Sequence, residues 1–132
     1  MIIGIIVSAL LYPIYGLNVL IILISNILID ADHYLWYILR FNSYDLVKAF
    51  RFSKDKKLRL KYGRLLHIFH TAEVLILIII LSFYSEIFFL VLIGVVVHLL
   101  LDIIDLLLIR KHINLRIWSF LEYLIIKIKR FL

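Results

Sequence analysis

The sequence predicts an all-α protein, a polytopic integral membrane helical bundle with short interfacial amphipathic helices. Apolar residues make up 65% of its 132 residues, whereas about 45–50% is usual for soluble globular domains. The mean hydropathy is +1.10, and one Pro and four Gly interrupt the chain. A chain of this length forms one domain, residues 1–132. Most of its surface is therefore expected to face lipid.

The first apolar run covers residues 2–29, which is longer than one membrane span needs. Pro13 and Gly16 offer a break in it, because Pro removes a backbone donor and Gly permits a turn. We therefore expect one helix over about 2–12 and a longer one over about 17–39, with a single long kinked helix as the alternative. The run lacks a basic start and a small-residue cleavage site, so it is expected to remain in the mature protein.

A polar stretch follows the second predicted helix. Ser43 is suited to cap a short amphipathic helix over 44–53. The apolar face of this helix would carry Leu46, Val47 and Phe50. The basic run from 54 to 64 is expected to lie at anionic lipid headgroups.

Two further spans are expected, over 65–83 and 87–109. The connection between them has no Lys or Arg and should lie outside, so the two spans form a hairpin with both basic ends inside. Residues 115–131 predict an interfacial amphipathic helix, because polar side chains recur at roughly helical spacing on an apolar rod. These polar side chains are Arg116, Ser119, Glu122, Lys127 and Arg130.

The distribution of charge indicates a location and excludes some partners. The chain has 15 basic and nine acidic residues, a net charge of +6, and the basic residues fall in blocks 40–64 and 110–130 that flank apolar runs. The positive-inside rule predicts that both blocks are cytoplasmic, in a multi-pass protein of the inner cell membrane. The expected partners are membrane lipids and not nucleic acid. The absence of Cys excludes disulfides and thiolate metal ligands.

Ionisable residues within the apolar segments are the most informative feature of the sequence. A carboxylate at the bilayer centre costs about 3 kcal/mol, and these segments contain no Lys or Arg to pair with it. Nine acidic or histidine side chains nevertheless lie there, namely Asp30, Asp32, His33, His67, His70, Glu73, His98, Asp102 and Asp105.

The spacing of these residues predicts that most of them share helix faces. Neighbouring members of each cluster are three or four residues apart, and such residues lie on one side of a helix. Asp32 is the exception, and it is expected to point elsewhere unless the helix is distorted or Asp32 supports the ligands. Counting inward from the basic edges at about 1.5 Å per residue puts the three clusters at about 10–15, 5–14 and 8–18 Å. These depths overlap in the cytoplasmic half of the membrane.

A metal centre accounts for this set. The five carboxylates carry a charge of about −5, which two divalent cations would largely offset. The predicted cofactor is one or two divalent ions, zinc foremost, with manganese or iron as alternatives. The predicted metal ligands are Asp30, His33, His67, His70, His98, Asp102 and Asp105, and the predicted catalytic residues are Asp32 and Glu73.

The motifs resemble a family of membrane-bound predicted metal-dependent hydrolases over roughly residues 20–106. Its Leu-Pro-Asp-x-Asp-His element is matched by Ile29-Asp30-Ala31-Asp32-His33 without the proline, and its His-x-x-x-Asp element by His98 to Asp102. Its His-Arg-Gly-x-Thr-His-Ser element is matched at its end by His70-Thr71; the Arg and Gly are missing, and His67 precedes His70 by three residues instead of five. The family pattern has no counterpart of Glu73 or Asp105.

The resemblance implies a hydrolytic metalloprotein of the inner membrane, related in ligand pattern to zinc-dependent phospholipases C. The resulting hypothesis is a membrane-embedded metal-dependent hydrolase of a lipid or other phosphoester at the cytoplasmic leaflet. The alternatives are a non-enzymatic ion or proton conduit, a metal-binding membrane scaffold, and a protein that shapes membranes through its amphipathic ends.

Overall fold

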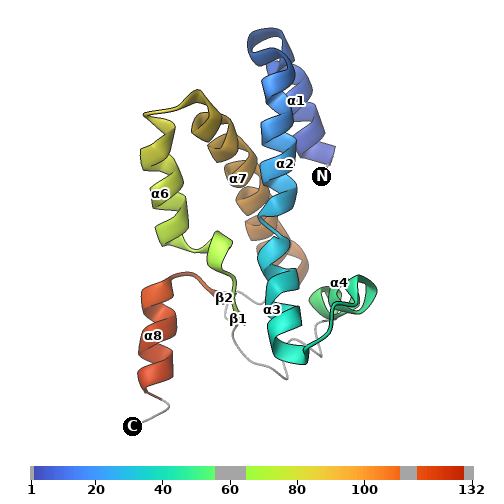
Figure 1. Cartoon of the computed structure of the whole chain (residues 1–132), viewed down its shortest axis with the longest axis vertical. Coiled ribbons are helices and arrows are strands. Elements are labelled where there is room, and N and C mark those ends of the chain that lie inside the picture. Colours follow the sequence, from blue (N-terminus) through green and yellow to red (C-terminus); the bar gives the residue numbers. More distant parts are fainter. Residues whose placement is uncertain (1, 56–64, 111–115, 130–132) are drawn as a thin grey trace.

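The structure, a computed structural model, describes residues 2–55, 65–110 and 116–129. It is all-α apart from one pair of two-residue strands. The longer helices run along one axis of the molecule, and short helices lie at one end (Figure 1). Two helical stretches, Ile2–Phe41 and Glu86–Ile104, are long and apolar enough to cross a membrane. The predicted all-α class is therefore confirmed.

The first apolar run folds into a helical hairpin. Helix α1 (Ile2–Tyr15) is followed by a 3₁₀ turn, η1 (Gly16–Val19), and by α2 (Leu20–Leu28), which runs back beside α1 (Figure 1). The reversal occurs at Gly16, whose φ of 54° is open to glycine at little cost. Pro13 is accommodated inside α1. The chain therefore turns at Gly16, and the first helix extends beyond the predicted end at residue 12.

The second predicted helix, 17–39, is interrupted near its polar residues. After α2 the chain makes a short turn at 29–30 and continues as α3 (Ala31–Phe41). Asn42 ends α3 in the left-handed conformation with φ 49°, and its N–H donates to the Ile38 carbonyl at 2.8 Å. The turn at 29–30 is the distortion that changes the direction of Asp32.

The amphipathic helix α4 (Leu46–Lys54) is capped by Asp45, so the predicted cap at Ser43 is wrong. The Asp45 carboxylate accepts the Lys48 backbone N–H at 3.0 Å, and this bond holds the pKa of Asp45 below its usual range. Ser43 instead accepts the Asp45 N–H through its hydroxyl at 3.4 Å. Phe52 of α4 packs in a buried cluster with Tyr37 of α3.

The predicted span 65–83 is a helix only in its second half. Strand β1 (Leu65–Leu66) and a 3₁₀ turn, η2 (Ile68–His70), precede α6 (Ala72–Ser82). The continuous helix predicted there is therefore wrong for residues 65–71. Helix α7 (Glu86–Ile104) follows and continues as a π-helical segment, η3 (Asp105–Arg110), close to the predicted 87–109.

The C-terminal segment is joined to the irregular segment 65–71. Strand β2 (Arg116–Ile117) pairs in parallel with β1, and α8 (Phe120–Ile128) follows it. The Ala72 N–H donates to the Trp118 carbonyl at 2.9 Å. The helix predicted over 115–131 is therefore wrong at its start, because the chain there forms a strand and satisfies backbone groups of the neighbouring segment.

Close packing of α2 against α7 fixes the upper part of the bundle. Gly94 of α7 lies on the backbone of α2, where an added Cβ would come within 2.5 Å of the Ile22 carbonyl oxygen. The Asn26 side chain donates to the Gly94 carbonyl at 3.2 Å. Ile22 and Leu90 are fully buried in this interface. The two helices therefore meet backbone to backbone, one turn above His98.

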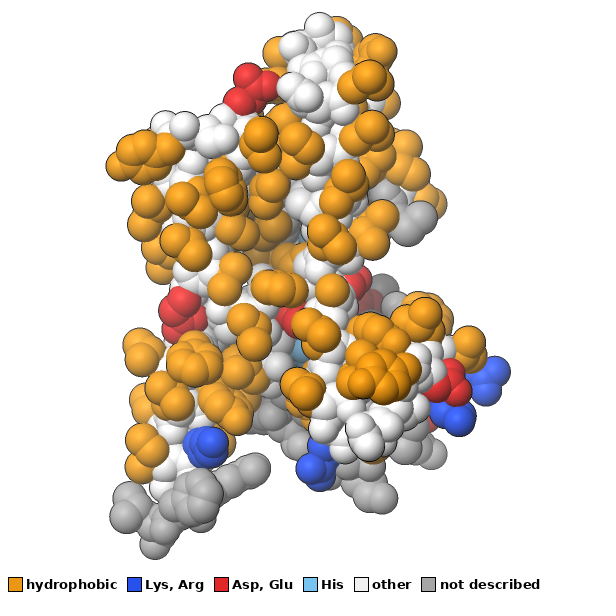
Figure 2. Space-filling view, viewed as in Figure 1, with side chains coloured by type: hydrophobic (Ala, Val, Ile, Leu, Met, Phe, Trp, Pro, Cys, Tyr) orange, Lys and Arg blue, Asp and Glu red, His pale blue; other side chains and the backbone are white. Residues whose placement is uncertain are grey.

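The surface is strongly apolar around the long helices and basic at one end. Figure 2 shows apolar side chains over the upper part, and Lys and Arg side chains near α4 and α8 at the lower end. Within each membrane-length window, 17% of the residues are buried inside the protein. The predicted basic blocks lie partly outside the described residues, at 56–64 and 111–115.

Candidate metal centre

Three segments bring seven of the predicted residues together below the α2–α7 interface. One segment is the turn between α2 and α3 together with the first residues of α3, another is the irregular stretch between β1 and α6, and the third is the last part of α7. Acidic and histidine side chains show at the surface there (Figure 2). The groups of neighbouring ligand atoms come from Asp30, Asp32, His33, His67, His70, His98 and Asp102.

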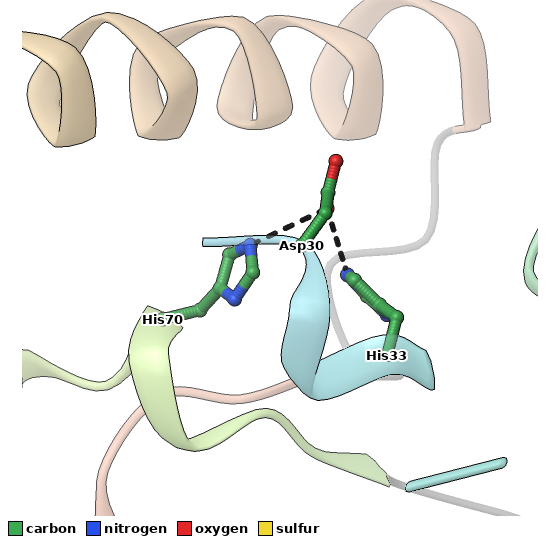
Figure 3. A group of neighbouring side chains, drawn as sticks. All are labelled: Asp30, His33 and His70. Carbon is green, nitrogen blue, oxygen red and sulfur yellow. Dashed lines mark ion pairs between the residues drawn. The ribbon is translucent and has the colours of Figure 1, made fainter. Parts of the chain in front are cut away.

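Asp30 lies at the centre of the first group. Figure 3 shows its side chain between His33, on the same segment, and His70, on the opposite one. Its Oδ1 is 3.4 Å from Nε2 of His33, 3.9 Å from Nε2 of His70 and 3.5 Å from Nε2 of His98. The side chain of Asp30 is 56% exposed, so the protein leaves this side of the site uncovered.

His70 is held by one ring nitrogen and presents the other to the site. Its Nδ1 donates to Oδ2 of Asp32 at 3.0 Å. Its Nε2 is buried and has no hydrogen-bond partner among the described residues. The Asp102 carboxylate lies 3.6 Å from that Nε2. A metal-binding imidazole usually donates its other ring N–H to a carboxylate, as Nδ1 of His70 does to Asp32.

His98 has the same arrangement with a different support. Its Nδ1 donates to the Asn26 carbonyl at 2.9 Å, a bond that the close packing at Gly94 allows. Its Nε2 likewise lacks a hydrogen-bond partner in the described part of the chain. Oδ1 of Asp102, four residues later on α7, is 3.7 Å away. Two imidazoles thus direct their Nε2 lone pairs at the same pair of carboxylates.

The separations fit ligand atoms that share a metal ion. Zinc binds histidine and carboxylate at about 2.0–2.2 Å, so two ligand atoms are about 3.3 Å apart at a tetrahedral angle and at most about 4.3 Å apart. The distances around Asp30 and Asp102 are 3.4–3.9 Å, at or beyond the long end of hydrogen-bond lengths and within this range. Among the described residues, His70, His98, Asp30 and Asp102 form the best-supported ligand set.

Asp32 supports the site from behind. Its Oδ2 accepts both the His70 ring N–H and the Phe69 backbone N–H, the latter at 2.9 Å. The side chain is 5% exposed. It reaches the irregular segment because the helix is broken at 29–30, which was the condition for Asp32 to join the cluster.

His67 and His33 lie on the other side of Asp32. Nδ1 of His67 is 3.7 Å from Oδ1 of Asp32, and the rings of His33 and His67 are 3.7 Å apart between centroids. Each of the three residues offers one ligand atom within 4.8 Å of the others. His33 belongs to this group and also to the group around Asp30.

Glu73 and Asp105 lie outside the three groups of ligand atoms found among the described residues. The Glu73 carboxylate instead accepts the Ser119 hydroxyl and the backbone N–H groups of Phe120 and Leu121, at the start of α8. The predicted role of Glu73 as a base assumed a helix through 65–83, and that helix begins only at Ala72. Asp105 begins the π-helical segment.

Two supporting groups have no direct sign in the sequence. The Asn26 carbonyl and the Phe69 N–H are backbone atoms, so neither depends on its side chain. The only local signal was that Asn26 is one of the few polar residues in its apolar run.

Searches against protein-family models, curated proteins and solved structures find no match to this chain. The chemistry of the site therefore follows from its own residues: buried histidines and carboxylates that offer a divalent metal ion a set of ligands.

Proposed function

We propose that the protein is a membrane-embedded metal-dependent hydrolase that cleaves a phosphoester of a lipid at the cytoplasmic leaflet. One observation carries the proposal. The buried Nε2 atoms of His70 and His98 lack hydrogen-bond partners among the described residues and face the carboxylates of Asp30 and Asp102 at metal-sharing distances. Imidazole with carboxylate suits zinc, manganese or iron.

A divalent ion held by these residues would polarise a phosphoryl oxygen and make water a better nucleophile near neutral pH. In the proposed reaction, water adds to phosphorus and the bond from phosphorus to an alkoxide oxygen breaks. The proton lost by water ends on the released alcohol, so that the products are a phosphate ester and an alcohol. Asp30 is the carboxylate that water reaches most readily, since 56% of its side chain is exposed.

The membrane location rests on the exposed apolar surface. A core helix of a soluble protein is mostly buried, whereas 17% of each membrane-length window is buried here. Exposed apolar side chains cover the upper part of the molecule (Figure 2), and burial in lipid is the ordinary reason for such a surface. The site lies between this apolar part and the basic end, and in the proposed orientation a lipid phosphate would approach it from the cytoplasmic headgroups.

A conduit is less well supported. The buried polar side chains above the site are Ser8, Ser25 and Asn26, and each donates a hydrogen bond to a backbone carbonyl. The Asn26 bond joins α2 to α7, as polar side chains commonly do between transmembrane helices, and the Ser25 bond lies within α2. They do not form a continuous row of ionisable groups.

Elemental analysis of the purified full chain, combined with hydrolysis of a phospholipid panel in the presence of zinc, manganese or iron, tests the proposal. We expect stoichiometric metal, and we expect His98→Ala to lower both metal content and hydrolysis, the latter by about 100-fold or more. Glu73→Gln is the matched control and should retain the metal. The proposal fails if the wild-type chain holds none of these metals and His98→Ala changes neither metal content nor stability.

A further inference from the structure

The Asp32 carboxylate has one oxygen that the first ligand set does not explain. Oδ2 accepts two N–H groups, but Oδ1 has no hydrogen-bond partner among the described residues. The side chain is 5% exposed, so water does not reach that oxygen from outside. A buried carboxylate oxygen left without a partner is costly, because the charge has lost its hydration. Something positively charged is therefore expected beside Oδ1.

Two histidines lie where ligands of such a cation would be. Nδ1 of His67 is 3.7 Å from Oδ1 of Asp32, a separation that two atoms bound to one zinc ion can have. The His33 ring lies against the His67 ring, with 3.7 Å between centroids. His67 is 3% exposed, so both it and Asp32 are withdrawn from solvent.

The charge of the whole centre leads to the same conclusion. Asp30, Asp32 and Asp102 contribute three negative charges when the histidines are neutral, and one divalent ion leaves the centre negative. A negative centre would repel the phosphate of a phosphoester. A second divalent ion makes the centre positive, which favours an anionic substrate.

We infer that Asp32, His33 and His67 bind a second divalent metal ion, so that the protein carries a two-metal centre for an anionic phosphoester. This inference rests on the proposed function. Asp32 would connect the two sites. Its Oδ2 accepts the ring N–H of His70, a ligand of the first ion, and its Oδ1 would bind the second ion. Centres with two metal ions commonly stabilise both the attacking and the leaving oxygen of a phosphoryl displacement.

Zinc stoichiometry separates the two sites, because His67 belongs only to the group with Asp32 and His33, and His98 only to the group with His70 and Asp102. The purified full chain is loaded with zinc, freed of excess metal and analysed for zinc per chain. We expect two ions in the wild-type chain and one in His67→Ala, and also one in His98→Ala. Glu73→Gln, whose carboxylate contacts α8, should keep both. Circular dichroism checks that each variant is folded.

The outcomes distinguish the inference from the proposed function. A wild-type chain with one ion, or a folded His67→Ala variant that keeps two, overturns the second site and leaves the first. A wild-type chain with no zinc overturns both. If His67→Ala does not fold, His67→Gln replaces it, and a cobalt titration of the wild-type chain must still show two successive absorption changes. A single change overturns the inference.

Discussion

At Gly94 the absence of a side chain lets α7 lie directly on the backbone of α2. An added Cβ would come within 2.5 Å of the Ile22 carbonyl oxygen and would also meet the Ser25 hydroxyl. Backbone cannot move aside without separating the helices. This contact lies one turn from His98, whose ring is held by the Asn26 carbonyl of α2. Packing at Gly94 and the position of the His98 ring are therefore linked.

Gly94→Ala is expected to lower the free energy of unfolding by about 1–3 kcal/mol, the usual cost of overpacking a core. It should also weaken metal binding, because α2 carries the acceptor for His98. Thermal unfolding in detergent and a chelator competition measure the two effects. Gly4→Ala is the matched control, since its Cβ would meet the Asn26 side chain at an ordinary 3.4 Å. Equal stability of the two variants would contradict the tight contact.

In the proposed centre, Asp32 would act on the first ion through His70, whose ring N–H it accepts. In the His67→Ala background, where one ion is expected, Asp32→Asn should weaken the remaining ion about 10- to 100-fold, as loss of a supporting carboxylate usually does. The cause is that the amide no longer fixes which nitrogen of His70 carries the proton. Zinc affinity measured against a chromophoric chelator checks this. An unchanged affinity would mean that His70 is not a ligand.

Among the elements, the break between α1 and α2 and the helix α7 could be predicted, and the segment 65–71 could not. Gly16 and Pro13 mark the break in the sequence. Hydropathy shows residues 65–83 as one apolar run, but His67 and His70 reach Asp32 from an extended and a 3₁₀ backbone. The groups that allow this backbone are distant in the sequence. They include β2, which pairs with β1, and the Trp118 carbonyl.

The candidate site was predicted better than the elements that carry it. Burying an acid or a histidine in an apolar run is costly whatever the backbone conformation. Residues such as Asp30, His70 and His98 could therefore be recognised from the sequence even where the helix around them was predicted wrongly. Glu73 was assigned to the site because it lies three residues after His70, and residues at that spacing share a face in a continuous helix. The helix begins at Ala72, so that implication does not hold.

Helix α8 is fastened by Glu73, which receives the N–H groups of Phe120 and Leu121 and the Ser119 hydroxyl. Glu73→Ala should speed hydrogen exchange at those two amides and leave the metal content unchanged. Hydrogen exchange with mass spectrometry measures this on peptides from the start of α8. Lys127→Ala, near the other end of the helix, serves as the control. Lost hydrolysis with unchanged exchange would instead restore Glu73 as a catalytic residue.

Helix α4 has two apolar sides with different partners. Phe52 is buried against α3, whereas Leu46, Val47 and Phe50 are 64%, 61% and 65% exposed. Lys48 is also exposed and lies off that apolar face, so the helix suits the interface of a membrane. The natural chain has no Cys, which makes single-cysteine variants unambiguous.

In nanodiscs with anionic lipid, Phe50→Cys should react with a membrane-impermeant maleimide roughly tenfold more slowly than Lys48→Cys, because an apolar environment raises the pKa of a thiol. Labelling rates followed by mass shift give the comparison. The same pair in detergent-solubilised, denatured protein should react at equal rates. Equal rates in nanodiscs would show that the apolar face of α4 does not contact lipid.

At the scale of the whole molecule, the two ends differ in composition. The turns at Gly16 and between α6 and α7 lie at the end away from α4 and α8 (Figure 1). The Lys and Arg side chains visible in Figure 2 lie at the opposite end. For the proposed membrane protein, the positive-inside rule predicts a cytoplasmic basic end, with the proposed metal centre between it and the apolar part.

Tyr84, between α6 and α7, and Tyr44, before α4, are 83% and 75% exposed and form a matched pair for testing this orientation. In sealed right-side-out vesicles, Tyr84→Cys should react with an impermeant maleimide, and Tyr44→Cys should react only after permeabilisation. Helix α6 is 11 residues long, about 16 Å, which is too short to cross a membrane by itself. Segment 65–71 would therefore have to cover the rest of the crossing. Protection of both cysteines until permeabilisation would show that α6 and α7 enter and leave on the cytoplasmic side. The phosphoester would then still be reached from the cytoplasm, but α7 would no longer count as a span.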